Sequence, residues 1–217
     1  MSKGNFAVIG LGRFGSSVAR TLINLGHDVL GIDKDEKKVE ELSNILTHVI
    51  VADSKKEEVL QKIGIRNFDT VIVAIGHDLE ANILTTVLLS QFGIKNIIAK
   101  ASSDIHGDVL LRVGATKVVF PERDMGEKIG KGICSGNFLD FIDISPEYSV
   151  VEVIAPKRFL NKSLGSLNLR PKYEISVLAI KKRDRILVAP GANDIVEDGD
   201  LLVVIGENNK LSTCFEI

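Results

Sequence analysis

The chain has 217 residues, of which 45% are hydrophobic and 26% charged, and its formal net charge at pH 7 is −2. This balance is typical of a globular protein and lacks the basic excess of a nucleic-acid-binding domain, so we expect no nucleic-acid partner. No apolar run approaches the roughly 20 residues of a membrane-spanning helix, so we expect a cytoplasmic protein that reaches a membrane only through a partner.

The first predicted strand, residues 6–9, runs into a glycine-rich turn that is followed by a helical pattern. The turn reads Gly10-Leu11-Gly12-Arg13-Phe14-Gly15, which is the GxGxxG pattern. In this pattern the first glycine permits a tight turn, the second lets the backbone approach a pyrophosphate, and the third lets the helix pack closely on the strand. The free N–H groups at the start of the helix then favour bound phosphates.

The second predicted strand, residues 29–32, ends at Asp33. An acidic side chain about 20 residues after the turn is placed to accept hydrogen bonds from a ribose, and its charge disfavours the 2′-phosphate of NADP. Together the two features predict a nucleotide site. The alternative is a structural glycine turn followed by an unrelated surface aspartate.

Continuous apolar strands and helical patterns then alternate as far as residue 120. This alternation predicts an α/β fold, a Rossmann-like doubly wound parallel sheet over residues 1–120 with helices on both faces. The further strands are expected at residues 48–52, 70–75, 96–99 and 117–120, and the longest helices at 36–46 and 79–92.

In such a sheet the ligand lies beyond the carboxyl ends of the strands. Asp53 and Ser54 fall where an adenine edge commonly lies, although a helix N-cap explains Ser54 equally well. Lys100 reaches either a phosphate or solvent. The other candidate nucleotide-binding residues at these strand ends are Lys34, Ala74, Ile75 and Gly76.

Arg13 lies inside the glycine turn, where a guanidinium can neutralise phosphate charge through paired hydrogen bonds. A pyrophosphate held by backbone amides does not need this charge, whereas a nucleoside di- or triphosphate does. Arg13 therefore favours ATP or ADP as the ligand. The alternatives are that its side chain points to solvent or reaches a neighbouring subunit.

The chain lacks an evident catalytic constellation. Its four histidines are scattered, and the lysine of a GxxxxGK[ST] phosphate loop is missing. The pattern predicts a protein that binds and senses a nucleotide and is not an enzyme. The alternatives are a small NAD-dependent oxidoreductase, which needs a poised acid or base, and a redox-sensing transcription factor, which needs a basic DNA-binding segment.

Residues 121–145 are predicted as a helical crossover segment. Its first part reads Pro121-Glu122-Arg123-Asp124-Met125 and continues with four glycines up to residue 136, so its own helix propensity is low. It packs either on another subunit or within the chain. Glu122 either holds a cation near the phosphates or is a first-turn acid that suits the helix dipole.

The pattern changes near residue 146. Strand-like runs at 149–154, 175–180, 185–189 and 201–205 are joined by short turns, which predicts a small α+β subdomain over residues 146–217. Cys134 and Cys214 show no metal spacing and indicate no disulfide.

The glycine turn, Asp33, the run Val73-Ala74-Ile75-Gly76 and the run from Pro121 to Met125 together resemble one family. It is the Ktr/Trk-type potassium uptake regulatory subunit, built from an RCK domain, and the chain is most similar to members with a single RCK unit. The resemblance extends over essentially the full length.

The resemblance implies an octameric ring built from dimers, which docks on a membrane potassium channel subunit at the inner face of the plasma membrane. ATP or ADP, or NAD or NADH, would bind in the cleft and change the ring conformation. By the same resemblance Arg13 would contact the ATP γ-phosphate near the dimer mate, Asp33 the ribose, and Glu122 a cation at the dimer interface. The helical segment at 121–142 would be the dimer crossover.

Some members bind cyclic di-AMP in the C-terminal subdomain. The comparable region of this chain carries Leu169, Arg170, Tyr173, Ile175 and Pro190. The chain departs from the pattern at Asp35, where relatives often carry a different polar residue, and two adjacent acids would alter nucleotide preference.

Overall fold

The structure, a computed structural model, describes residues 3–134 and 138–215. The chain divides into two compact units, residues 1–123 and 124–217. None of the helices in the described ranges has the length and apolar character needed to cross a bilayer.

The N-terminal unit is built on a six-stranded sheet in the order β3-β2-β1-β4-β5-β6, with every pair of neighbours parallel. The order reverses beside β1, which is the switch point where a doubly wound sheet opens a crevice. The prediction of a Rossmann-like parallel sheet is therefore confirmed. The strands are β1 (Asn5–Ile9), β2 (Asp28–Asp33), β3 (His48–Val51), β4 (Thr70–Val73), β5 (Asn96–Lys100) and β6 (Lys117–Val119).

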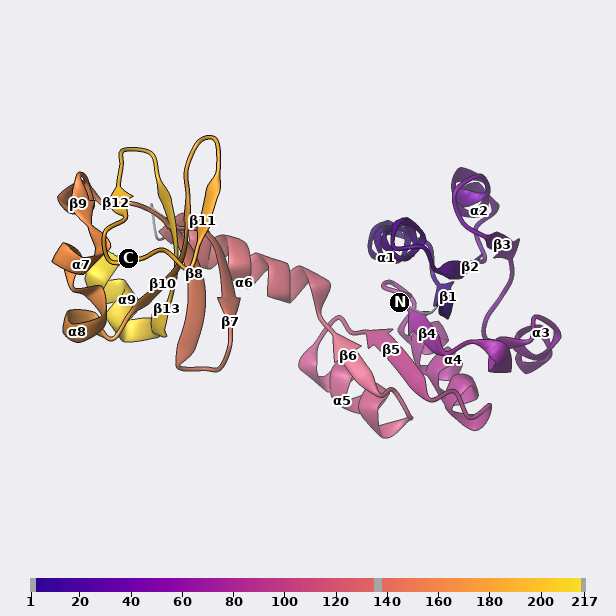
Figure 1. The fold of residues 1–217 in the computed structure, drawn as a ribbon. Helices are drawn as coiled ribbons and strands as arrows, with labels where there is room; N and C mark the ends of the chain where they lie inside the picture. Colours follow the sequence, from indigo (N-terminus) through magenta and orange to yellow (C-terminus); the bar gives the residue numbers. More distant parts are fainter. Residues whose placement is uncertain (1–2, 135–137, 216–217) are drawn as a thin grey trace. The chain divides into compact units, whose positions relative to one another are not determined.

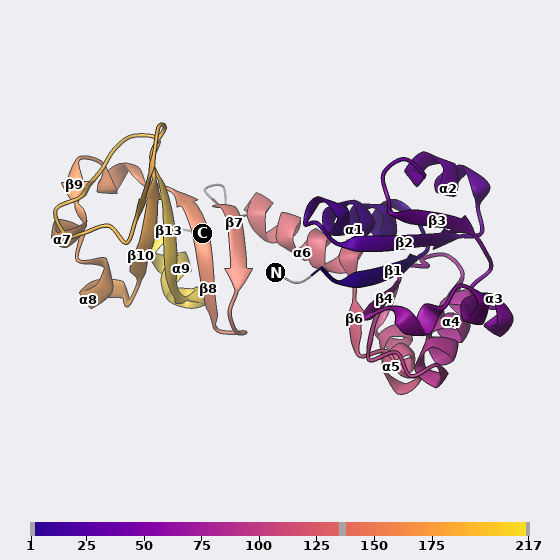
Figure 2. The ribbon, with the colours of Figure 1, turned by 45° about the vertical axis from the view of Figure 1, so that its right-hand side comes forward.

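Helices cover both faces of this sheet, as the two ribbon views show (Figure 1, Figure 2). Side chains of α1 and α2 pack on one face, and those of α3, α4 and α5 on the other. The helices are α1 (Arg13–Asn24), α2 (Glu36–Leu42), α3 (Glu57–Lys62), α4 (Leu79–Gln91) and α5 (Asp104–Arg112), with a 3₁₀ turn at Ile65–Asn67.

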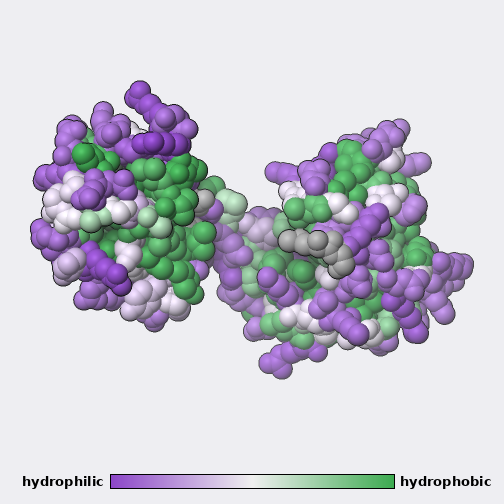
Figure 3. All heavy atoms as spheres, in the orientation of Figure 1, coloured by the Kyte–Doolittle hydropathy of each residue, from purple (hydrophilic) through white to green (hydrophobic). Residues whose placement is uncertain are grey.

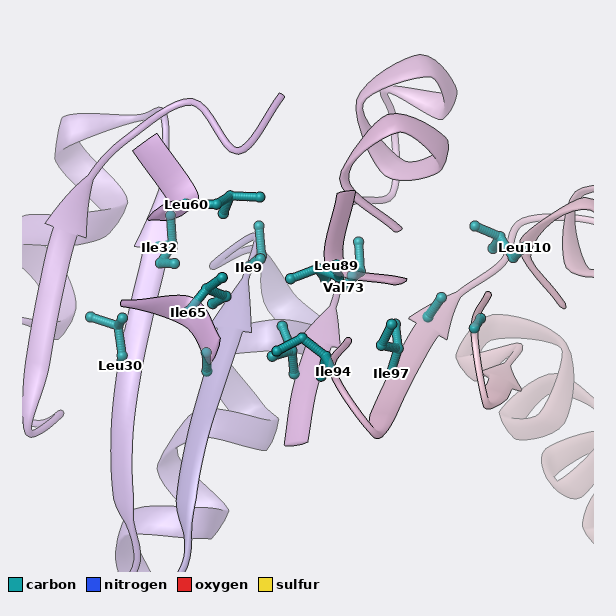
Figure 4. Close-up of a cluster of buried hydrophobic side chains, with 14 of the residues drawn as sticks. Ile9, Leu30, Ile32, Leu60, Ile65, Val73, Leu89, Ile94, Ile97 and Leu110 are labelled. Atoms are coloured by element: carbon teal, nitrogen blue, oxygen red, sulfur yellow. The ribbon is translucent and has the colours of Figure 1, made fainter. Parts of the chain in front are cut away.

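The core of this unit follows from the alternation of side chains along each strand. On one face Ile9, Val73 and Ile97 meet Leu89 and Leu110 from the covering helices (Figure 4). Neighbouring strand residues such as Val8 and Ile72 point to the opposite face. Both faces are apolar because both are covered, which explains the unbroken hydrophobic runs in the sequence.

The crossover segment differs from its prediction. Helix α6 spans Pro121–Cys134, but Phe138–Asp143 forms strand β7, which pairs antiparallel with β8 (Tyr148–Ile154). The prediction of helix over the whole of 121–145 is wrong at this point, because a run rich in aromatic and β-branched residues favours a sheet. Residues 135–137 of the predicted segment lie outside the described residues.

The C-terminal unit is an α+β subdomain, as predicted. Its five-stranded sheet has the order β11-β10-β13-β8-β7, with antiparallel neighbours. The remaining elements are β9 (Lys162–Ser163), α7 (Leu164–Leu167), α8 (Leu169–Tyr173), β10 (Ser176–Lys181), β11 (Ile186–Val188), β12 (Ile195–Val196), β13 (Leu201–Glu207) and α9 (Asn208–Phe215), with a 3₁₀ turn at Lys157–Phe159.

One face of this sheet carries the subdomain core, in which Val153, Val204 and Phe215 are almost inaccessible. The space-filling view shows apolar surface beside β8 (Figure 3). Exposed apolar side chains of this unit include Ile154 and Val188, which are 40% and 78% exposed. The sheet is thus covered on one face and leaves apolar side chains accessible elsewhere.

A buried histidine makes the stability of the N-terminal unit depend on pH. Burial lowers the pKa of His106 in α5, and its Nδ1 accepts a hydrogen bond from the backbone N–H of Ser102 at 3.3 Å. Because the pKa is lower in the folded than in the unfolded chain, acid favours unfolding once the pH falls below the unfolded value of about 6.5.

We therefore expect the free energy of unfolding to decrease between about pH 7.5 and about pH 5.5, and to decrease less in a His106→Gln variant. Urea denaturation at a series of pH values measures both slopes. His48→Gln, which changes an exposed histidine, is the matched control and should retain the slope of the unmodified chain. Equal slopes for His106→Gln and the unmodified chain would contradict the prediction.

Candidate functional site

A cleft of about 260 Å³ lies at the carboxyl ends of β1, β2, β3 and β4. It brings together most of the residues that the sequence predicts for nucleotide binding. The predicted residues that line it are Gly10, Gly12, Asp33, Lys34, Asp53, Ser54, Ala74, Ile75 and Gly76, and they are joined by Ile9, Ile32, Lys38, Ala52, Lys55, His77, Asp78 and Ala81.

The three glycines of the turn differ in the room that each leaves for a side chain. Gly10 has a φ of +95°, and a Cβ there would lie 2.9 Å from the carbonyl carbon of Ala74. A Cβ on Gly15 would lie only 1.9 Å from the carbonyl oxygen of Gly10, so the helix can pack here only without a side chain. A Cβ on Gly12 would meet nothing within 4 Å, which leaves the space in front of the α1 N-terminus open to a phosphate.

Asp33 is 8% exposed and lies where the sequence places it, at the end of β2 beside the turn. Its Oδ2 accepts a hydrogen bond from the Leu11 backbone N–H at 2.7 Å, and its Oδ1 accepts one from the Asp35 N–H at 2.9 Å. Lys38 Nζ is 3.4 Å from Oδ2. The carboxylate therefore holds the glycine turn in place while it lines the cleft. Its Oδ2 accepts from both Leu11 and Lys38, whereas Oδ1 keeps accepting capacity for a ribose hydroxyl.

Ser54 is buried, and its Oγ lies 2.8 Å from Oγ1 of Thr85 in α4. The alternative in which Ser54 caps a helix is wrong, since α3 has Lys56 at its N-cap position and no side-chain cap. Asp53 accepts a hydrogen bond from the Lys55 N–H at 3.1 Å, which forms a tight turn at the end of β3.

Asn82 in α4 supports the wall of the cleft. The sequence did not predict this role. Asn82 is wholly buried, and its Nδ2 donates to the carbonyl oxygens of Ile75 at 2.6 Å and Lys100 at 2.9 Å. The amide thereby joins the chain after β4 to the end of β5. A lone asparagine in an apolar helix gives no sequence signal for this role, because both carbonyls are distant in the chain.

Lysine and acid side chains face each other around the cleft. Lys34 Nζ is 3.4 Å from Asp78 Oδ2, and Lys55 Nζ is 3.5 Å from Glu80 Oε1. Lys38 and Lys55 line the cleft but were not predicted, although each follows a candidate acid in the sequence by a few residues. The lysines among the lining residues are balanced by Asp33, Asp53 and Asp78, so an anionic ligand would compete with these carboxylates for the ammonium groups.

Arg13 is exposed in the first turn of α1 and is absent from the cleft lining. Phe14 follows it, and Gly15 lies behind the turn. Arg13 is therefore accessible from solvent and is not one of the lining residues, and its predicted contact with a phosphate stays a prediction beside the alternatives of solvent and a neighbouring subunit.

Lys100 and Glu122 form an ion pair, with Nζ 2.5 Å from Oε1. The hydrogen bond from Lys100 lowers the pKa of Glu122. In the described residues no three histidine, cysteine or acidic side chains gather as a metal site would require. A cation at Glu122 therefore needs ligands beyond this carboxylate.

The predicted cyclic di-AMP residues have mixed surroundings. Leu169 and Ile175 are buried in the core of the C-terminal unit, whereas Arg170 is exposed and Tyr173 and Pro190 are half-buried. Arg170, Tyr173 and Pro190 thus keep solvent-accessible surface, while the two aliphatic side chains pack inward.

Comparison with known proteins assigns both units. The model of the TrkA-N domain matches residues 6–121, and that of the TrkA-C domain matches residues 149–217. The chain is 44% identical to Ktr system potassium uptake protein C of Bacillus subtilis (strain 168) over 97% of this chain and 95% of that protein. It is 43% identical to Ktr system potassium uptake protein A of the same organism over 95% of this chain and 93% of that protein.

The fold also matches a solved structure. The crystal structure of the GsuK RCK domain has a TM-score of 0.69 to this chain at 18% sequence identity. The match covers 99% of this chain and 47% of that one, so the chain spans about half the length of the solved protein. At this identity the likeness is one of fold.

Proposed function

Because this chain belongs to the TrkA-N and TrkA-C domain family that includes the Ktr potassium uptake proteins, we propose that it is the cytosolic regulatory subunit of a potassium channel or transporter. The observation that carries this proposal is the match to two Ktr system proteins over nearly the full length of both chains. The family resemblance predicted from the motifs is confirmed by the same match.

The ligand that we propose for the cleft is a nucleotide, with ATP or ADP preferred and NAD or NADH as the related alternative. The open space before Gly12 suits the phosphates, and Asp33 suits the ribose. Asp53 and Ser54 line the same cleft after the end of β3, and we assign the base to them. Lys34 and Lys100 supply positive charge on either side.

We propose that the nucleotide acts by shifting the protein between conformations and is not turned over. Such a shift requires that ATP and ADP bind the two conformations with unequal affinity. ATP and ADP would differ in this way if the γ-phosphate, which only ATP carries, contacts a group that does not line the cleft. Arg13, in the first turn of α1, is the group that we assign to this contact, in company with the dimer mate.

The subunit is proposed to work as a homo-oligomer, a dimer assembled into an octameric ring. Glycine-rich helix α6 exposes Met125 and Ile129, which are 54% and 53% exposed. Such side chains on a helix of low intrinsic propensity gain stability from a second copy of the chain. The ring would lie in the cytoplasm and reach the inner face of the plasma membrane through its membrane partner.

Two further ligands complete the proposal. A divalent or monovalent cation would bind Glu122 with ligands from the nucleotide or the dimer mate. Cyclic di-AMP would bind the C-terminal unit near Arg170, Tyr173 and Pro190, close to the packed Leu169 and Ile175.

Replacing Arg13 by alanine tests the assignment of the γ-phosphate. We expect ATP affinity to fall about tenfold, which is about 1.4 kcal/mol, and ADP affinity to change by less than about twofold. Isothermal titration calorimetry on the full chain measures both. Arg20→Ala, which removes an exposed arginine from the same helix, is the matched control and should leave both affinities unchanged.

Equal losses of ATP and ADP affinity in Arg13→Ala would reject the γ-phosphate role but keep a nucleotide site. If the unmodified chain binds neither adenine nucleotides nor NAD, the proposed function itself is wrong. Hydride transfer from a hydroxy or amino acid to NAD would instead favour the oxidoreductase.

A further inference from the structure

Lys100 lies where three elements meet beside the cleft. Its Nζ is 3.3 Å from the point where a Cβ on Gly76 would stand, and 6.0 Å from the centroid of the Phe14 ring. Gly76 lines the cleft, and Phe14 belongs to the first turn of α1. The ammonium group is therefore at the edge toward which phosphates held by the start of α1 would extend.

The partner of this ammonium is far more exposed than the ammonium itself. The Lys100 side chain is 13% exposed and that of Glu122, in the first turn of α6, is 72% exposed. An ion pair with so exposed an acid is weak, because water competes for the carboxylate. A phosphate in the cleft carries more charge and is less solvated, so it is the stronger partner for the same ammonium.

The carbonyl group of Lys100 is held by Asn82, whereas its ammonium group lies at the end of a four-carbon stem. Asn82 Nδ2 donates to the Lys100 carbonyl oxygen at 2.9 Å and to the Ile75 carbonyl oxygen at 2.6 Å. These bonds hold the strand end beside Gly76. The four-carbon stem of lysine has enough torsional freedom to move Nζ between two anions without displacing the strand.

We propose that Glu122 and the terminal phosphate of a bound nucleotide compete for the Lys100 ammonium group. The inference rests on the proposed function, since it requires a nucleotide in the cleft. Without nucleotide, Lys100 ties the first turn of α6 to the end of β5. When the phosphate binds the Lys100 ammonium group, the Glu122 carboxylate loses its partner. The first turn of α6 is then no longer tied to β5, so nucleotide binding in the cleft changes how α6 is held.

The test is the affinity of the full chain for ADP, measured by titration calorimetry in EDTA so that no divalent cation bridges Glu122 to phosphate. Removing the competitor with Glu122→Gln should tighten ADP binding about two- to fivefold. Lys100→Met should weaken it about tenfold. Adenosine, which has no phosphate, should bind all three chains equally.

Asp104→Asn is the matched control for the loss of one surface acid. Asp104 pairs with Arg123 at 2.5 Å in the same unit, is 83% exposed and does not line the cleft. It should leave ADP affinity unchanged. Hydrogen exchange of the amides of residues 125–128, which bond back to the carbonyls of the first turn of α6, gives a second readout, which ADP should accelerate in the unmodified chain and which should already be fast in Glu122→Gln.

Unchanged or weaker ADP binding by Glu122→Gln in EDTA would overturn the competition, provided that the unmodified chain binds ADP. Failure of the unmodified chain to bind any adenine nucleotide would instead count against the proposed function. Thermal melting of each variant separates a loss of folding from a loss of affinity.

Discussion

Replacing Gly15 by alanine is expected to lower the free energy of unfolding of the N-terminal unit by about 3 kcal/mol or more. The added Cβ would lie 1.9 Å from the carbonyl oxygen of Gly10 and 3.0 Å from the Cβ of Ala74. The first contact is with backbone that closes the glycine turn, so a side-chain rotation cannot relieve it. Urea denaturation followed by circular dichroism measures the loss.

Gly12→Ala is the matched control and should lower nucleotide affinity while it leaves the free energy of unfolding almost unchanged. Gly12 has an extended backbone with a φ of −68°, and its Cβ would meet nothing within 4 Å. The free energy of unfolding should therefore change by less than about 1 kcal/mol. ADP affinity should nevertheless fall at least about tenfold, because the methyl group occupies the approach of the phosphates.

A Gly15→Ala protein as stable as the unmodified chain would show that the turn and helix can separate without cost. A Gly12→Ala protein with unchanged ADP affinity would place the phosphates elsewhere. The two results are independent, since one measures the packing of α1 on β1 and the other measures ligand approach.

Replacing Asp33 by asparagine should reduce both stability and nucleotide affinity. An amide has one acceptor oxygen, so it cannot accept from both the Leu11 and Asp35 backbone N–H groups as the carboxylate does. We expect a loss of about 2–3 kcal/mol in the free energy of unfolding, typical of an unsatisfied buried donor. ADP affinity should fall about tenfold, through the ribose contact and the loosened turn.

Asp53→Asn is the control for this substitution. Asp53 also lines the cleft, but it is half-buried, and among the residues that the structure describes its carboxylate accepts only from the Lys55 N–H within its own turn, a bond that an asparagine oxygen can accept equally well. It should change stability by less than about 0.5 kcal/mol. If Asp33→Asn behaved like Asp53→Asn, the bracing role of the Asp33 carboxylate would be rejected.

The sheet and the part of the cleft formed by the glycine turn could be predicted because their signals are local. Unbroken apolar runs identified the buried parallel strands, and each glycine of the turn has a steric task that spacing alone defines. Asp33 was found in the same way, from its distance after the turn. Its second role, as acceptor of the Leu11 N–H, depends on how the strands pair and has no signature in the sequence.

The missed features depend on contacts between distant parts of the chain. The hydroxyl of Ser54 contacts Thr85, 31 residues away, and so does not cap the helix that follows it. Strand β7 is the exception, because its signal is local: its aromatic and β-branched residues favour a sheet, and it pairs with the next strand, β8, across a short turn. The strands β9 and β12 have two residues each, too few for any alternation to show.

Helix α4 is held on the sheet by hydrogen bonds as well as by the packing of apolar side chains. The Asn82 side chain donates hydrogen bonds to carbonyl groups after β4 and on β5, and the Thr85 hydroxyl is hydrogen-bonded to the Ser54 hydroxyl after β3. A helix held by aliphatic packing alone can shift along the sheet at little energetic cost. A shift of α4 would leave several buried polar atoms without hydrogen-bond partners at once. If the cleft changes shape, α4 and the ends of β3, β4 and β5 therefore move as one rigid unit.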